Sequence, residues 1–186
     1  NWTQLLFILV AGTLSLGRAQ EAEEHPVQDL KYLIVVDSSY SMLTRRHATM
    51  GSVEGLVKSG FQNQIQPGDK FAVWTFNDQI DSGSFTPRVW DPKKAQELAD
   101  EATLFAGQNG NKARASFDLL LSELGHLPPL TTNVLVVLFT DGAERLYGTP
   151  FDAVVNTAFE KDALTLRASA RPFVVAYCIQ DGPFTH

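Results

Sequence analysis

The chain of 186 residues is short of cysteine: it contains only Cys178. An internal disulfide is therefore excluded, and the fold has to be stabilised by core packing instead of cross-links. The sequence also lacks a Walker loop, a Gly-x-Gly-x-x-Gly motif and a Gly-x-Ser-x-Gly motif, which removes the usual sequence signals of nucleotide binding and of serine hydrolases.

An excess of basic residues is absent as well. The chain has 15 lysines and arginines against 21 aspartates and glutamates, which gives a formal net charge of −6. Such a surface does not attract nucleic acid or anionic lipid by its net charge, but it tolerates cations. With 44% hydrophobic and 19% charged residues, the composition fits one globular domain with a sizeable core.

No apolar run reaches the length that a bilayer requires. The stretch from Leu5 to Leu16 is shorter than the approximately 20 residues of a membrane-spanning helix and fits a signal peptide over residues 1–19. Gly17 and Ala19 stand at the small-residue positions before a cleavage site ahead of Gln20. We therefore expect a secreted or extracytoplasmic protein that is not inserted in a membrane after cleavage. The alternative is a buried amino-terminal helix.

Apolar runs and amphipathic segments alternate after an acidic linker at 20–29. The apolar runs predict strands, and the amphipathic segments predict helices. The last predicted strand is an apolar run that ends at Ile179. Strands are expected at 31–37, 70–76, 84–90, 133–141 and 173–179, and helices at 41–60, 91–104, 112–124 and 151–159. This order predicts an α/β domain over 30–186, a doubly wound, Rossmann-like, mostly parallel sheet with helices on both faces and one antiparallel edge strand. A covering helix should follow the last strand, so we expect the chain to be a piece of a longer protein.

Two of the buried strands end in an acidic residue. Asp37 is followed by Ser39 and Ser41, and Asp141 ends the strand at 133–141. In an open α/β sheet, ligands bind outside the carboxyl ends of the strands, so both acids should face one crevice. Carboxylate and hydroxyl oxygens suit Mg²⁺, Ca²⁺ or Mn²⁺ and are poor ligands for zinc. The alternative is that these side chains cap the first helix through local hydrogen bonds.

At these residues the chain resembles the von Willebrand factor A family and its metal ion-dependent adhesion site. Asp37, Ser39 and Ser41 match the signature Asp-x-Ser-x-Ser, Thr140-Asp141-Gly142 is similar to the second acidic motif, and the element order agrees from about Leu30 to Ile179. The resemblance implies that Ser39 and Ser41 bind the cation directly and that Asp37 and Asp141 act through water. It also implies that a glutamate or aspartate of a protein partner completes the coordination.

One ligand departs from the family pattern. The family has a threonine in a glycine-rich loop, where this chain has Gly107-Gln-Asn-Gly-Asn-Lys112. Asn111 takes the position if the following helix is aligned, and Asn109 if the first glycine is aligned. Either amide oxygen could ligate Mg²⁺, although asparagine is longer than threonine.

We expect Tyr40, Asn109, Arg45 and Tyr147 to contact the partner. For Arg45, together with Arg46 and His47, the alternative is a solvated helix surface.

Three functions follow from these observations. The first is a non-enzymatic adhesion or protein-interaction module in which the cation binds a partner carboxylate. The second is a magnesium-dependent phosphotransferase with Asp37 as nucleophile. Against it, Ser39 occupies the place where haloacid dehalogenase-type chemistry requires a second carboxylate. The third is a metal-free interaction scaffold. The sequence specifies neither the partner nor the oligomeric state.

Overall fold

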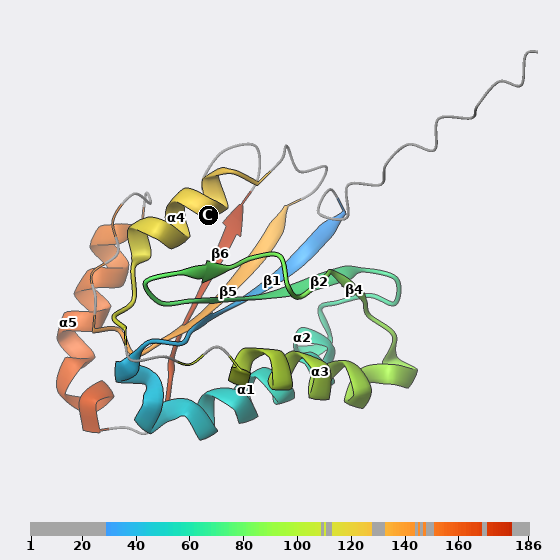
Figure 1. Ribbon diagram of the computed structural model, residues 1–186, viewed down its shortest axis with the longest axis horizontal. Helices are drawn as coiled ribbons and strands as arrows, with labels where there is room; N and C mark the ends of the chain where they lie inside the picture. The colour runs from blue at the N-terminus through green and yellow to red at the C-terminus, as the bar shows by residue number, and fades with distance from the viewer. Residues whose placement is uncertain are drawn as a thin grey trace, which may run out of the picture.

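The computed structural model of the chain describes residues 29–108, 110, 113–127, 133–143, 145, 147, 151–168 and 171–179. In this part of the chain, a β-sheet lies between two layers of helices (Figure 1). The strands are β1 (Leu30–Asp37), β2 (Lys70–Phe76), β3 (Ile80–Asp81), β4 (Arg88–Val89), β5 (Val134–Thr140) and β6 (Phe173–Ile179). The predicted signal peptide and the linker as far as residue 28 lie outside the described residues.

The centre of the sheet is parallel, and the α/β class predicted from the sequence is confirmed. The strand order is β3-β2-β1-β5-β6, with β4 also paired to β2. β1 runs parallel to both of its neighbours, β2 and β5. Its side chains alternate between two cores, since Leu33 and Val35 face one and Ile34 and Val36 face the other. Burial on both faces explains why this strand is a continuous apolar run.

The edges of the sheet differ from the prediction. β3 and β4 are antiparallel to β2, and β6 is antiparallel to β5, with Thr140 paired to Phe173. The prediction of a single antiparallel edge strand is therefore wrong, the sheet is mixed, and a fully doubly wound, Rossmann-like arrangement is not confirmed. Only four residues separate the end of α5 (Asp152–Ala168) from β6. Phe173, the first residue of β6, pairs with Thr140 at the end of β5, so α5 ends near this edge of the sheet. Since a residue spans at most about 3.5 Å, the link is too short to reach the opposite edge, where a seven-residue strand parallel to β5 would begin.

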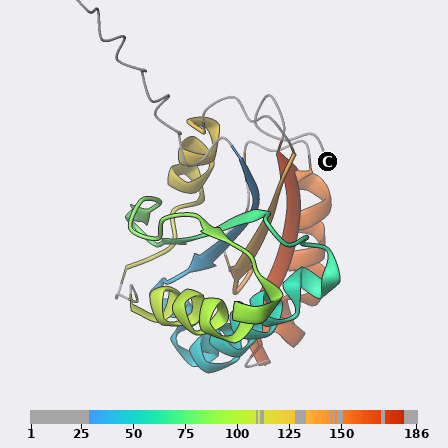
Figure 2. The same cartoon turned by 90° about the vertical axis from the view of Figure 1, so that its right-hand side faces the viewer.

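Helices cover both faces of the sheet, as predicted. α1 (Arg46–Lys58) and α3 (Ala95–Gln108) pack on one face through Val53, Val57, Ala99 and Ala102. α4 (Phe117–Gly125) and α5 pack on the other, as the two views show (Figures 1 and 2). Fully burying a valine, leucine or phenylalanine side chain contributes roughly 1.5–3 kcal/mol, so these two cores are the main source of stability.

Several predicted boundaries shift. The helix expected at 41–60 is a 3-10 helix, η1 (Tyr40–Arg45), followed by α1 and by a turn, α2 (Gly60–Asn63), with left-handed backbone angles. A short 3-10 helix, η2 (Pro92–Lys94), precedes α3. The edge strand expected at 84–90 is reduced to β4.

The helix expected from 112 begins only at Phe117, after the capping residue Ser116. The preceding residues are tied to the sheet edge instead: Tyr40 N–H donates to the Ala113 carbonyl at 2.9 Å, and Ser116 N–H to the Asn77 carbonyl at 2.8 Å.

Candidate metal centre

The strands that carry the two predicted acidic ligands lie side by side. Val36 of β1 pairs with Phe139 of β5, so Asp37 lies next to Thr140 and Asp141 follows directly at the same edge. β2 ends on the other side of β1, where Asp37 pairs with Phe76. The next strand in the chain, β2, pairs with one side of β1, and the later strand β5 pairs with the other side. Such a reversal of strand order opens a crevice at the carboxyl ends of the strands.

Asp37 is the buried acid of this edge. Asp37 is only 2% exposed. One carboxylate oxygen accepts a hydrogen bond from the Ser39 N–H at 2.9 Å, and the other accepts one from the Thr140 hydroxyl, also at 2.9 Å. Burial raises the pKa of Asp37 from 3.8 to about 6. The hydrogen bonds from Ser39 and Thr140 oppose this rise, and the negative charge of Asp141 adds to it. A cation at this edge would stabilise the ionised carboxylate.

Ser39 and Ser41 place their hydroxyl groups next to each other. The two Oγ atoms are 3.1 Å apart, with Ser39 buried and Ser41 exposed. Neither hydroxyl caps a helix: Ser39 stands at the N-cap position of η1 without a side-chain capping bond, and the N-cap residue of α1 is Arg45. The capping alternative is therefore not supported for these serines, and their oxygens face the same side of the loop.

Asp141 stands at the first position after β5 and is partly exposed. Its carboxylate accepts the N–H of Ala143 at 2.9 Å. Gly142 adopts a φ of +68°, a left-handed conformation, and a Cβ there would lie 3.2 Å from the Phe159 ring. Glycine suits this turn because it avoids both the strain and the contact.

Three residues to which the sequence analysis assigned no role hold the site together. Thr140 joins β5 to Asp37, as described above. Ser38 donates from its N–H and from its hydroxyl to the Phe76 carbonyl, at 2.8 and 3.1 Å. The Asn77 side-chain amide donates to the Ser38 hydroxyl at 3.0 Å. Two sequence features could have indicated these residues: Asn77 directly follows the strand predicted at 70–76, and Thr140 belongs to the Thr-Asp-Gly motif.

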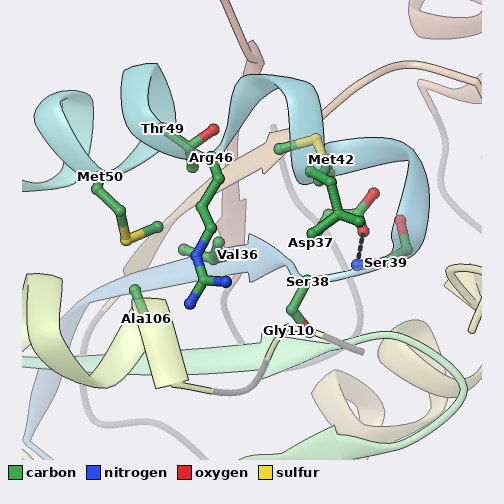
Figure 3. A pocket seen from close by; sticks show the side chains of 11 residues that line it. Val36, Asp37, Ser38, Ser39, Met42, Arg46, Thr49, Met50, Ala106 and Gly110 are labelled. Carbon is green, nitrogen blue, oxygen red and sulfur yellow. Dashed lines mark hydrogen bonds between the residues drawn. The ribbon is translucent and has the colours of Figure 1, made fainter. Parts of the chain in front are cut away.

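The predicted third ligand cannot be placed, because Asn109 and Asn111 lie outside the described residues. The glycines around Asn109 lie against α1. The Arg46 guanidinium donates to the Gly107 carbonyl, and a Cβ on Gly110 would lie 3.4 Å from Arg46 Nη1. Figure 3 shows Arg46 extending from α1 toward Gly110, in a pocket that Asp37, Ser38 and Ser39 also line. Arg46 thus joins the described part of this loop to the start of α1.

The predicted partner-contacting residues divide into exposed and buried ones. Tyr40 and Tyr147 are 62% and 59% exposed, in the segments that follow β1 and β5. Arg45 is only 7% exposed, so for this residue the alternative of a solvated helix surface is wrong. Arg46 and His47 are exposed.

Within the described residues, no group of three or more histidines, cysteines, aspartates or glutamates is placed to hold a metal ion. Among these residues, the candidate centre contains two such acids, Asp37 and Asp141, and its other described donors are hydroxyl oxygens. The described part of the chain also contains no helix that is long and apolar enough to cross a membrane.

No family model matches the chain, and no curated protein matches it.

Proposed function

We propose that the chain is a von Willebrand factor A-like binding domain of an exported protein, which holds one Mg²⁺ ion and through it a glutamate or aspartate of a protein partner. The observation that supports the proposal is the arrangement at the sheet edge. Asp37 is buried there, the Ser39 and Ser41 hydroxyls are 3.1 Å apart, and Asp141 follows the neighbouring strand.

The donor set fits a hard divalent cation. Two carboxylates and two hydroxyls offer only oxygen, which Mg²⁺, Ca²⁺ and Mn²⁺ accept and which zinc does not favour. The raised pKa of Asp37 adds a physical reason, because a buried carboxylate without a compensating charge is costly. In this proposal Ser39 and Ser41 hold the ion directly, while Asp37 and Asp141 hold its water molecules.

The same geometry argues against a phosphotransferase. A nucleophilic carboxylate needs an oxygen that a phosphoryl group can reach in line, whereas Asp37 is 2% exposed and both of its oxygens accept hydrogen bonds. A water molecule of the cation is much smaller and needs only a remaining lone pair of the carboxylate. The position two residues later is Ser39, which cannot provide carboxylate acid–base catalysis. We therefore propose a non-enzymatic module. The exposed Tyr40 and Tyr147 suit a protein-binding surface, where aromatic side chains are enriched.

Calorimetric titration of the metal-free protein with Mg²⁺ tests the proposed function. We expect a saturable isotherm with a stoichiometry of one, and a thermal midpoint that rises with Mg²⁺ and falls again when a chelator is added. Parallel titrations with Ca²⁺ and Mn²⁺ establish which ion is preferred. Absence of both heat and stabilisation for all three ions would contradict the proposal and support the metal-free scaffold.

A further inference from the structure

A polar cleft opens next to the candidate metal centre. It has a volume of about 350 Å³ and lies between the segment after β1, the segment after β5, and α5. Ser41 and Asp141, which belong to the candidate centre, also line this cleft. A ligand whose first group reaches the cation is therefore positioned to place a second group in the cleft.

Arg45 provides a positive charge in the wall of the cleft. The residue is 7% exposed, and its Nη1 atom donates to the Ser41 carbonyl at 3.4 Å, which holds the guanidinium next to the loop of the candidate centre. The Thr49 hydroxyl donates to the Arg45 carbonyl at 3.0 Å. Since a charge in a partly enclosed site interacts more strongly than one in open water, Arg45 is well suited to hold an anionic group.

The cleft contains other charged residues besides Arg45. Arg145 forms an ion pair with Glu160, and both residues line the cleft. Asp141 accepts the N–H of Ala143 and is proposed to face the cation. The chain as a whole carries a formal charge of −6, which repels an acidic partner at long range. Local cationic groups are therefore needed for a partner that binds through carboxylates.

We infer that this cleft is a second subsite, in which Arg45 binds a second carboxylate of the ligand whose first carboxylate is bound by the cation. The inference rests on the proposed function and makes it more specific: the preferred ligand is a segment with two nearby acidic groups. An arginine can bind a carboxylate through two parallel hydrogen bonds, which fixes orientation as well as adding affinity.

Titration of the Mg²⁺-loaded protein with small carboxylates, followed by nuclear magnetic resonance shifts, tests the inference. Succinate, glutarate and adipate span different distances between two carboxylates, and butyrate has only one. We expect the best of the three dicarboxylates to bind on the order of tenfold more tightly than butyrate. At saturating Mg²⁺, Arg45→Gln should reduce this ratio to about one.

Two further variants keep the test decisive. Lys58→Gln removes an exposed positive charge at the far end of α1 and should preserve the dicarboxylate preference. Ala163→Leu fills the cleft from α5 without altering a charge and should abolish the preference even if Arg45→Gln fails to fold. Equal binding of butyrate and all three dicarboxylates, or a preference that survives both cleft variants, would overturn the subsite while Mg²⁺ binding upholds the proposed function. A protein that binds no Mg²⁺ would overturn both.

Discussion

Asp37→Asn is expected to lower the affinity for Mg²⁺ by roughly 100-fold, the upper range for losing a group that orients a metal's ligands or water. The amide has nearly the shape of the carboxylate, so its oxygen can still accept the N–H of Ser39. Its NH₂ group can donate to the Thr140 hydroxyl, which reverses the bond that Thr140 now makes. What the substitution removes is the negative charge, so binding should be lost while the fold is retained.

Calorimetry with Mg²⁺ and thermal unfolding of the same samples measure both parts of this expectation. Asp100→Asn is a matched control, because Asp100 is exposed on α3, and within the described residues its carboxylate accepts a hydrogen bond only from Gln96, one turn earlier in the same region of the chain. It should leave the affinity for Mg²⁺ unchanged. Undiminished Mg²⁺ binding by Asp37→Asn would remove Asp37 from the site, and loss of the folded state would assign it a structural role instead.

The metal-free protein is expected to lose stability, relative to Asp37→Asn, as the pH rises from 4 to 7. The pKa of Asp37 is about 6 in the folded protein, against an ordinary value of 3.8. The folded state therefore binds the proton more tightly than the unfolded state does. The resulting stabilisation is fully present below about pH 4 and is lost as the pH passes 6. A shift of this size corresponds to roughly 3 kcal/mol.

Urea unfolding at several pH values in the presence of a chelator measures this contribution. Other acidic residues titrate in both proteins, so the informative quantity is the free energy of unfolding of wild type minus that of Asp37→Asn. This difference should decrease between pH 4 and 7, and saturating Mg²⁺ should reverse the decrease. A difference that does not change with pH would show that Asp37 ionises in the folded protein as it does in an unfolded chain.

The central strands could be predicted closely from the sequence. β1 and β2 each begin within one residue of the prediction and end at the predicted residue. Both are apolar runs that lie between helices on two faces, and such runs have few alternative structures. The same reasoning predicted that Asp37 and Asp141 end two buried strands and face one crevice, because ligands in an open α/β sheet bind outside the carboxyl ends of the strands.

The errors have a common cause in long-range contacts. An apolar strand has the same pattern in either direction, so 173–179 could not reveal that β6 is antiparallel to β5. The residues before Phe117 include good helix formers, yet their carbonyl and N–H groups bond to Tyr40 and Asn77. Propensity alone could not anticipate those partners.

At the candidate metal centre, the sequence pattern indicated which side chains are present but not which hydrogen bonds hold them in place. Thr140 and Asn77 act through bonds to Asp37 and Ser38, residues far away in the sequence. Arg45 is another example. The two turns of 3-10 helix in η1, which the sequence did not predict, place this residue in the wall of a cleft. Only the three-dimensional arrangement shows such partners.

A crystal structure of the Mn²⁺-loaded protein tests the central claim most directly, because Mn²⁺ can replace Mg²⁺ and gives an anomalous signal. The account predicts one anomalous peak at the carboxyl ends of β1 and β5, within direct bonding distance of the Ser39 and Ser41 hydroxyls, with Asp37 and Asp141 in contact with its water molecules. A peak elsewhere, or none at this edge at saturating Mn²⁺, would contradict it.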